Sequence, residues 1–308
     1  MTLKQHLLNL YREYGGSSDI TEPTPEVELL VSTMNKDDEE FLEGMISEMD
    51  KTQLYITVVN QRSGERRAET GEKKEKEKQK GKECFSHAIR IFDVDDSGLS
   101  KSRNTALKIA TGDICLFADD DLVYYEGFAE CVNLAHHFFP EYHVILFRVN
   151  DGTKQPARRY ADKISERNIE NAAAVISYEI SFKRDAVVET GVRFDEMFGL
   201  NATFHISEER IFIADCINAG LKVLEIPIAI VEHKGISTGL NPDNRYINQV
   251  CHGAAYARIY GRQEALRRFS VSMSRIDPDA PVSRMDDYLY FFKGITDYCR
   301  MTEGNSQN

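Results

Sequence analysis

The chain has 308 residues, a hydrophobic share of 42% and a net charge of -12. A chain of this length can bury a substantial core, as one large α/β domain or as such a domain with a smaller appendage. The negative charge argues against a general affinity for nucleic-acid phosphates, so we expect no nucleic-acid partner.

Membrane and secretion signals are weak in this sequence. No run reaches the ~18 apolar residues that a membrane-spanning helix needs, and Met1–Tyr14 alternates polar and apolar residues instead of carrying an apolar centre. The cysteines lie far apart, without a C-x-x-C pair, which fits reduced thiols. They are Cys84, Cys115, Cys131, Cys216, Cys251 and Cys299. We therefore expect a cytoplasmic protein.

Strand and helix patterns alternate in the first third of the chain. Leucines in 3–11 predict a short helix, which the Gly-Gly-Ser-Ser run at 15–18 ends. The elements predicted next are a strand over 27–33, a helix over 37–50, and strands over 54–59 and 88–94. Strands that alternate with helices indicate a largely parallel sheet.

A charged segment separates the second and third predicted strands. Glu65–Glu83 contains eight Lys or Arg and six Glu, with no large apolar residue. Such a segment cannot bury a core, so we expect a mobile loop. A basic flap over an anionic ligand or a membrane is the functional alternative, but charge runs are usually just solvated.

The next predicted helix begins at a glycine-rich entry, Gly98–Asn104. A glycine allows close approach of a ligand to the backbone, and a helix start offers free N–H groups and a positive dipole end to a phosphate. Arg103 and Asn104 would add side-chain donors. Serine and glycine are also ordinary helix-capping residues, so Gly98–Asn104 alone is weak evidence for a phosphate site. Its position immediately before an acidic strand strengthens that interpretation.

That strand, over 114–118, is apolar and ends in Asp119, Asp120 and Asp121. Three adjacent carboxylates repel one another unless water, hydrogen bonds or a cation relieves them, and open α/β sheets bind ligands at the carboxyl ends of their strands. The strand end therefore suggests a site for a divalent ion. A solvated turn that caps the next helix is the alternative.

The remaining elements follow the same periodicities. We expect helices over 126–139, 184–191, 209–220, 244–260 and 285–302, and strands over 144–149, 176–183 and 226–231. His136 and His137 are expected on the polar side of their helix. Arg158 and Arg159 are expected in water, with contact to a bound substrate as the alternative. The last two helices are amphipathic, with Ile247 on the apolar face. Their apolar faces could pack on the preceding α/β domain, form a homodimer or touch a membrane.

The order of these parts resembles the family-2 glycosyltransferases with the GT-A fold. The matching segments are Val31–Asn35, Val58–Gln61, Gly98–Asn104, Ala110–Asp113, Ala118–Asp121, Phe194–Glu196, Ser207–Arg210, Ala219–Val223 and Val231–His233. Each is short, but together they occur in family order at fitting spacings. The resemblance implies a Rossmann-like, mixed and mostly parallel sheet flanked by helices, with a C-terminal helical extension. The expected division is a helical appendage over 1–25, a GT-A domain over 26–240 and a helical region over 241–308.

The resemblance also implies the site residues. They are Thr33, Asn35, Asn60, Gly98, Arg103, Asn104, Asp119 and Asp120 for the nucleotide-sugar, Asp119, Asp121 and His233 for Mg²⁺ or Mn²⁺, and Glu209 or its neighbour Glu208 as catalytic base. Asn60 stands where the family often has Asp, Ala118 where many relatives have another acid, and Glu209 where Asp is usual. By itself, a lone histidine at a strand end is more often structural than a metal ligand.

The implied activity is inverting transfer of a sugar from a nucleoside-diphosphate sugar, expected to be a UDP-sugar. The acceptor would be a hydroxyl of a glycan or lipid-linked molecule in surface polysaccharide assembly, with the enzyme cytoplasmic or peripheral at the inner face of the membrane. Two other classes are considered. A sugar nucleotidyltransferase would need an N-terminal Gly-rich phosphate loop, which the sequence lacks. A non-catalytic nucleotide-sugar binding protein would bind donor without turnover.

Overall fold

The structure is a computed structural model that describes residues 1–16, 27–46, 54–62, 89–171, 175–235, 244–274 and 282–305. The predicted loop over 65–83 lies outside these residues, as does the end of the helix predicted over 37–50. The chain forms two compact units, described separately here. The first comprises Met1–Ser97, Lys101–Arg193 and Cys216–Gly235, and the second Gly98–Ser100, Phe194–Asp215 and Ile236–Asn308. The division predicted at residues 25 and 240 stays a prediction.

The first unit is built on one mixed sheet. Within the described residues nine strands pair in the order β3-β2-β1-β4-β8-β6-β9-β5, with β7 beside β9. The strands are β1 (Val27–Met34), β2 (Leu54–Gln61), β3 (Ile89–Val94), β4 (Ile114–Asp119), β5 (Leu122–Tyr124), β6 (Val144–Asp151), β7 (Ser165–Arg167), β8 (Ile180–Lys183) and β9 (Val223–His233). Strands β1 to β4 pair in parallel, whereas β8 and β5 are antiparallel to their neighbours. The predicted mixed α/β class with C-terminal helices is confirmed.

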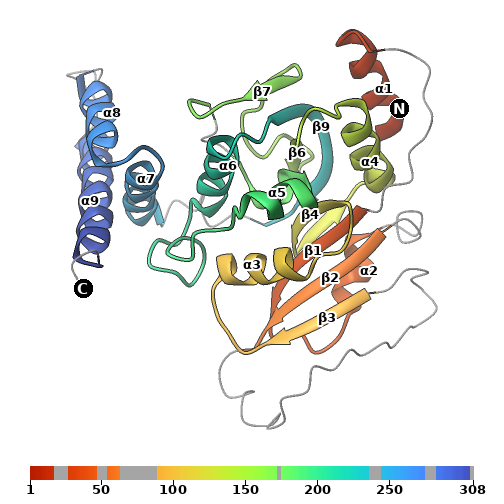
Figure 1. Cartoon of the computed structure of the whole chain (residues 1–308), viewed down its shortest axis with the longest axis horizontal. Coiled ribbons are helices and arrows are strands. Elements are labelled where there is room, and N and C mark those ends of the chain that lie inside the picture. Colours follow the sequence, from red (N-terminus) through yellow and green to blue (C-terminus); the bar gives the residue numbers. More distant parts are fainter. Residues whose placement is uncertain are drawn as a thin grey trace. The chain divides into compact units, whose positions relative to one another are not determined.

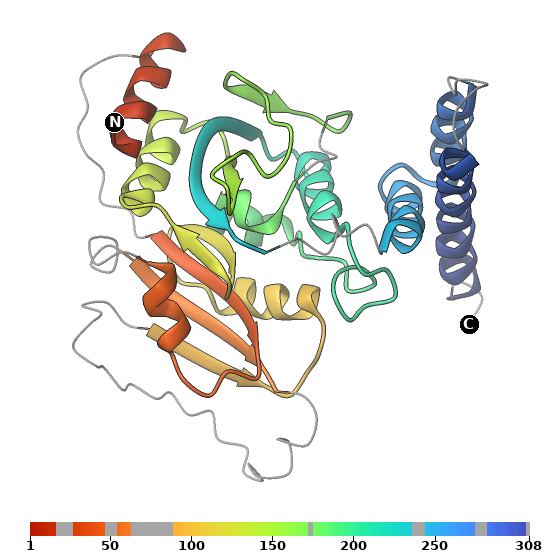
Figure 2. The ribbon, with the colours of Figure 1, turned by 180° about the vertical axis from the view of Figure 1, so that it is seen from behind.

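Helices cover both faces of the parallel half. The helical elements of this part of the chain are α1 (Leu3–Glu13), α2 (Glu40–Met45), α3 (Leu99–Ile109), α4 (Phe128–Phe138), the 3₁₀ turn η3 (Ser177–Glu179) and α5 (Arg184–Thr190). Figures 1 and 2, seen from opposite sides, show α3 on one face of β1 to β3 and α2 on the other. Strand β1 is accordingly buried on both faces, with Leu29, Leu30 and Val31 all fully enclosed.

The N-terminal helix is tied to this unit by aromatic packing. In both views α1 lies beside α4. The Tyr11 ring stacks on Phe138 with centroids 4.4 Å apart and meets Phe139 edge-on, and Leu7 is fully buried. Helix α1 therefore packs into the core of the first unit instead of standing apart from it.

A buried carboxylate joins the four parallel strands. Glu28 of β1 is fully buried. It accepts hydrogen bonds from Thr57 Oγ1 of β2 (2.6 Å), from Arg90 Nη2 of β3 (2.7 Å) and from the N–H groups of Thr111 and Gly112 just before β4 (2.6 Å each). Burial alone would raise the pKa of Glu28, but these hydrogen bonds outweigh it and lower the pKa. The Glu28 carboxylate is thus ionised, and both of its oxygens accept hydrogen bonds.

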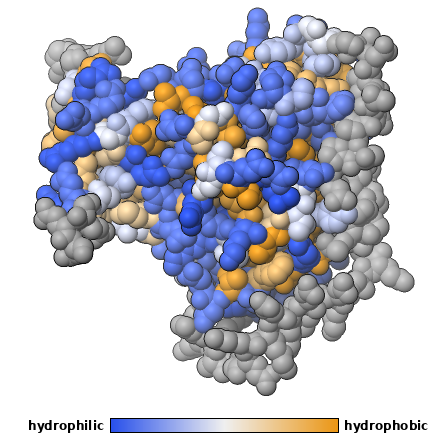
Figure 3. Space-filling view, in the orientation of Figure 1, coloured by the Kyte–Doolittle hydropathy of each residue, from blue (hydrophilic) through white to orange (hydrophobic). Residues whose placement is uncertain are grey.

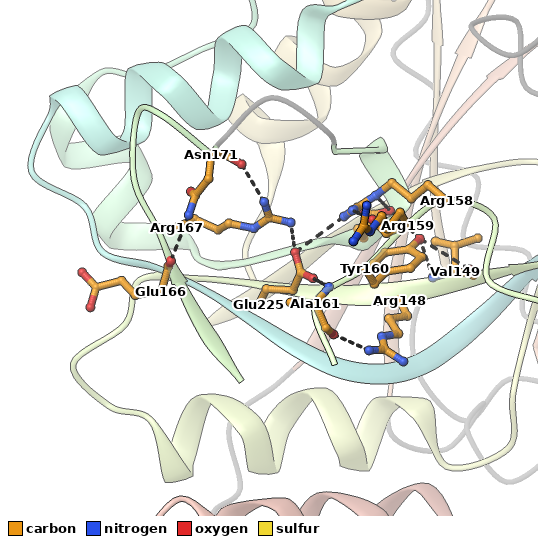
Figure 4. A network of polar contacts seen from close by, with 11 residues as sticks. Arg148, Val149, Arg158, Arg159, Tyr160, Ala161, Glu166, Arg167, Asn171 and Glu225 are labelled. Atoms are coloured by element: carbon orange, nitrogen blue, oxygen red, sulfur yellow. Dashed lines mark hydrogen bonds and ion pairs between the residues drawn. The ribbon is translucent and has the colours of Figure 1, made fainter. Parts of the chain in front are cut away.

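A second buried polar network surrounds strands β7 and β9 (Figure 4). Glu225 of β9 is fully buried, pairs with Arg167 of β7 and accepts the Ala161 N–H. Arg158 forms two bonds to the buried Glu179 (2.6 and 2.8 Å) and stacks on the Tyr160 ring at 3.9 Å. The expectation that Arg158 lies in water is therefore wrong, because two interior carboxylates require a buried cation.

Helix α4 and the strand predicted over 176–183 also differ in detail from expectation. His136 is 4% exposed and its Nε2 lies 2.9 Å from Ser181 Oγ, so it does not lie on the polar side as expected. Burial lowers the pKa of His136 to about 3, which keeps the ring neutral. The first half of the segment 176–183 is the 3₁₀ turn η3, and β8 begins only at Ile180.

The second unit is helical. It contains α6 (Glu208–Asn218, shared with the first unit), α7 (Arg245–Tyr260), α8 (Arg262–Ser274) and α9 (Val282–Asn305). Helices α7 and α9 approach closely at two glycines. A Cβ on Gly253 would lie 1.9 Å from the Phe291 carbonyl oxygen, and one on Gly294 the same distance from that of Val250. Ile247, predicted on the apolar face of its helix, is 49% exposed. Helix α8 was not predicted.

Two further observations concern the surface. The face drawn in Figure 3 is mostly hydrophilic, with apolar patches between the polar residues, as expected for a chain with a net charge of -12. Within the described ranges, none of the helices combines the length and the apolar character required to span a bilayer.

The Glu28 network makes a prediction about stability. Glu28→Gln should lower the free energy of unfolding at pH 7 by about 2–4 kcal/mol, because an amide cannot accept all the donors that surround the carboxylate. The native pKa of Glu28 is lowered, so its contribution is complete above the unfolded value of ~4.3 and is lost as the pH falls through the native pKa. Urea denaturation from pH 7 to pH 3 should show the difference between variant and parent shrink.

Glu130→Gln is the matched control, because Glu130 pairs with Lys4 (2.7 Å) while one third of its side chain is exposed. It should cost less than about 1 kcal/mol. Equal losses for Glu28→Gln and Glu130→Gln would contradict the role assigned to the buried carboxylate.

Candidate functional site

The parallel register brings polar residues to one edge of the sheet. Thr33 of β1 lies opposite Asn60 of β2, and Asn60 lies opposite Asp93 of β3. On the other side of β1, Ser32 lies opposite Asp119 of β4. Because all four strands run in the same direction, these side chains meet at the carboxyl ends of the strands, where open α/β sheets bind ligands.

The first acid, Asp119, faces a buried arginine. Arg103 of α3 is 1% exposed, and its Nη2 lies 3.2 Å from Asp119 Oδ1. Burial raises the pKa of Asp119, and the guanidinium of Arg103 acts in the opposite direction. Ser102 donates to Ser32 (2.9 Å) and fixes the same turn of α3 to β1. Arg103 therefore balances the charge of Asp119 from inside the protein.

The second acid, Asp120, is fixed to the end of β1. Its Oδ2 accepts a hydrogen bond from Thr33 Oγ1 at 2.5 Å and lies 3.2 Å from Lys36 Nζ. Lys36 belongs to the turn after β1, which begins at Asn35 with φ 54°. The Asn35 N–H donates to the Gln61 carbonyl at 2.9 Å. Sequence analysis did not single out Lys36, because the family resemblance that selected Thr33 and Asn35 ends at Asn35 in this part of the chain.

Asn60 stabilises this turn with its whole amide group. Its Nδ2 donates to the Lys36 carbonyl (2.7 Å) and to Asp93 Oδ1 (2.8 Å), and its Oδ1 accepts the Lys36 N–H (3.1 Å). Asn60 is 2% exposed. Both donor hydrogens are thus in use, whereas Asp93 is exposed at the edge. Asp93 was not selected from the sequence, because it lies inside the strand predicted over 88–94 and not after its end.

The third acid, Asp121, meets a histidine that is distant in the sequence. Strand β5 pairs with β9 so that Leu122 lies opposite His233, and His233 Nε2 lies 3.0 Å from Asp121 Oδ2. This hydrogen bond lowers the pKa of Asp121 and raises the pKa of His233. The pair therefore favours an ionised carboxylate beside a protonated ring.

Two neighbours restrict the His233 ring. The Tyr178 ring of η3 lies 5.5 Å from it between centroids, and Tyr178 is 3% exposed. A Cβ on Gly235 would lie 3.2 Å from His233 Nε2 and 3.9 Å from Asp121 Oδ2. Only a glycine lets the backbone pass so close to the pair. Neither neighbour was selected from the sequence.

The acids fit a divalent ion only in part. Among the described residues, no group of three or more His, Cys, Asp or Glu side chains is arranged to hold a metal. Asp121 and His233 bring one oxygen and one nitrogen within 3.0 Å of each other. Mg²⁺ is usually bound by one or two carboxylates completed by substrate phosphates and water. A small ligand set of this kind fits an ion that arrives with a diphosphate.

The remaining candidates lie at helix starts. Asn104 is in the first turns of α3 and half-buried, while Gly98, with φ 125°, belongs to the second unit. Glu208 and Glu209 begin α6, also in the second unit. Glu208 is 4% exposed and Glu209 is half-buried. The first unit thus brings Thr33, Asn35, Asn60, Arg103, Asp119, Asp120, Asp121 and His233 to one sheet edge and the turns around it.

A sequence model of a known family matches part of the chain. Residues 39–183 match the sequence model of the family described as Glycosyl transferase family 2, so the predicted resemblance is confirmed. No curated protein matches the chain.

Solved structures of TarS from S. aureus share the fold. TarS 1-349 in complex with UDP-GlcNAc superposes with a TM-score of 0.53 at 15% identity, over 88% of this chain and 81% of that chain. The complex of TarS 1-349 with UDP gives 0.52 at 16% identity, over 92% and 91%. The match to a longer TarS structure has a TM-score of 0.50 at 15% identity and covers 79% of this chain but only 43% of that one. The predicted GT-A fold is confirmed.

The Arg103–Asp119 pair can be tested by a double-mutant cycle. Arg103→Leu should lower the free energy of unfolding by about 3 kcal/mol, because it leaves a half-buried carboxylate without its cation. Adding Asp119→Asn should recover part of this loss. Lys101→Leu is the control on the same helix, since its pair with Asp96 is exposed, and should cost less than about 1 kcal/mol. Additive losses for Arg103 and Asp119, measured in urea, would argue against their coupling.

Proposed function

We propose that this chain, with its family-2 sequence pattern over residues 39–183 and its GT-A fold, is an inverting glycosyltransferase. It would transfer a sugar from a nucleoside-diphosphate sugar to a hydroxyl of a glycan or lipid-linked acceptor. The observation that carries this proposal is the sheet edge at which Asp119, Asp120 and Asp121 each have a separate cationic partner. The edge combines acids for a metal diphosphate with the polar ends of β1 to β3.

The donor side follows from this edge. The nucleoside would lie over the ends of β1 to β3, where Thr33, Asn35 and Asp93 present polar groups. Asn60 would act by holding the Lys36 turn and Asp93, since its own donors are in use. The diphosphate would meet the start of α3 near Gly98 and the side chain of Asn104, where the helix dipole favours an anion. Arg103 would keep Asp119 ionised.

The metal side would use Asp121 and His233, with Asp119 nearby. Either Mg²⁺ or Mn²⁺ suits oxygen-rich ligands, and when bound it would neutralise charge on the departing diphosphate. Neighbouring residues of the chain hold the His233 side chain in place for the ion. Tyr178 and Gly235 restrict the His233 ring, and the antiparallel pairing of β5 with β9 fixes its distance from Asp121.

Glu209 is the proposed base, which would take the acceptor proton as the acceptor oxygen attacks the anomeric carbon from the face opposite the leaving diphosphate. It begins α6, where the helix dipole favours an ionised carboxylate. Glu208 is less suited because it is 4% exposed and lies against Gly199, on which a Cβ would come 3.3 Å from Glu208 Cδ. Of these neighbouring acids, Glu209 is the one with a partly exposed side chain.

The donor is proposed to be a UDP-sugar, which the fold shared with a UDP-GlcNAc-bound TarS supports. The setting is proposed to be surface polysaccharide assembly in the cytoplasm, either free or peripheral at the membrane. A homodimer formed through the C-terminal helices is part of the same proposal, since these helices carry exposed apolar residues. Among them are Tyr246, Ile247, Leu289 and Phe292.

Donor binding can be tested by thermal shift. UDP and UDP-GlcNAc at about 100 times their dissociation constant should add about 2.7 kcal/mol of stability, with a larger effect when Mn²⁺ is present. Asp121→Asn should remove most of the Mn²⁺-dependent part. Asp185→Asn, which removes a 72% exposed carboxylate from α5, should leave it unchanged. An unaltered Mn²⁺ dependence in Asp121→Asn would refute the assigned metal position.

Catalysis can be separated from binding with Glu209→Gln. The amide cannot take a proton at neutral pH, so the rate of UDP release from UDP-sugars in the presence of sugar acceptors should fall by roughly 10² to 10⁴. Donor affinity, measured by thermal shift, should stay near that of the parent. Glu208→Gln is the comparison and should lose less activity per folded molecule.

A small loss for Glu209→Gln would assign the base to another acid. If the parent binds UDP-sugars but releases no UDP with any hydroxyl acceptor, the chain is a nucleotide-sugar binding protein and the transferase proposal fails.

A further inference from the structure

The residue immediately before the two glutamates has an unusual backbone. Among the described residues, the non-glycine residues with positive φ are Asn35, Lys154, Asn201 and Ser207. Asparagine adopts this region comparatively easily, and Lys154 lies in an exposed turn. Ser207 is different, because its φ is 85° and it is 8% exposed. A buried serine in a conformation that favours glycine needs an interaction that holds it there.

That interaction comes from α7. Ser207 Oγ lies 3.1 Å from Nδ1 of His252. Burial, together with the nearby Arg210, lowers the pKa of His252 to about 4, so the ring is neutral at pH 7. A neutral imidazole forms one hydrogen bond at Nδ1 without bringing a charge into the interior. Both residues lie in the second unit.

Ser207 also determines where α6 begins. Its carbonyl accepts the hydrogen bond from the Ile211 N–H at 3.2 Å, the first of the helix. Its side chain, which at a usual N-cap would accept from the first turn, is directed to His252 instead. The direction in which Glu208 and Glu209 leave the backbone therefore depends on the φ value at Ser207.

We propose that Ser207 and His252 are positioning residues: their hydrogen bond holds Ser207 in the left-handed conformation and so sets the first turn of α6, which carries Glu209. The functional part rests on the role of Glu209 in the proposed transferase. The conformational part does not, because it concerns contacts within the second unit alone.

The experiment is a mutant cycle with a glycine rescue. His252→Leu keeps the volume but removes the polar atom, and His252→Asn keeps a polar atom at the position of Nδ1. Ser207→Gly makes the left-handed conformation free of strain, so no hydrogen bond is needed. Each variant and each combination is measured by urea denaturation and by steady-state UDP release from UDP-GlcNAc.

We expect His252→Leu to lower activity and stability more when Ser207 is present than in the Ser207→Gly background. His252→Leu should lower kcat about tenfold, which equals about 1.4 kcal/mol, and change KM for the donor less than about twofold, because donor binding is untouched. His252→Asn should keep most of the activity. In the Ser207→Gly background, His252→Leu should have little effect on kcat and a smaller effect on stability than in the parent.

Two results would overturn the inference. If His252→Leu costs the same kcat and the same stability with and without Ser207→Gly, His252 acts only by packing. If it lowers stability but not kcat, the pair does not position Glu209. A protein without turnover would refute the proposed transferase instead, and the coupling in urea would still decide whether the hydrogen bond holds Ser207.

Discussion

The first unit depends on one buried charge, the carboxylate of Glu28. A fully buried anion is tolerated only when donors surround it, and here the donors come from β2, β3 and the segment before β4. A slip of one residue in any of these strands would turn a donor away, because successive residues of a strand face opposite sides. The carboxylate therefore selects one register near the amino end of β1. At the other end of the same strands, that register sets Thr33 beside Asn60, and Ser32 beside Asp119. The position of the site thus follows from a charge that takes no part in it.

The acidic edge shows how a protein keeps three adjacent carboxylates together. Each acid has its own cation, and each cation comes from a different element. Arg103 reaches Asp119 from α3, Lys36 reaches Asp120 from the turn after β1, and His233 reaches Asp121 from β9. The three cationic partners also differ in how constant their charge and position are. Arginine is always charged and here is fully buried, so Asp119 is compensated from inside the protein. Lys36 and His233 are respectively flexible and titratable, so Asp120 and Asp121 keep groups that can respond to a ligand.

Much of this fold could be predicted from the sequence because its signals are local. The strands β1 to β4, helix α3 and helix α5 with Gly191 in the left-handed conformation all follow from apolar runs and helix caps. The predictions that were wrong concern residues whose surroundings are determined by tertiary contacts. Arg158 and His136 were expected at the surface, but Arg158 pairs with the buried Glu179 and His136 contacts Ser181, and neither partner can be inferred from local periodicity. The meeting of Asp121 with His233 was implied only by family resemblance, since it requires the antiparallel pairing of two strands that are far apart in the sequence.

The pair Glu208 and Glu209 shows the limit most clearly. In the sequence two adjacent glutamates at a helix start are equivalent, and the helix dipole favours ionisation of both. Adjacent helical residues point about 100° apart, however, so only the backbone can decide which is enclosed and which is available. In the structure Glu208 is enclosed against Gly199, and Glu209 keeps a partly exposed side chain. The residue before them is a serine that adopts a backbone angle suited to glycine. A pattern of residue types does not contain this angle, so the assignment of a catalytic base at this position is a question of conformation before it is one of chemistry.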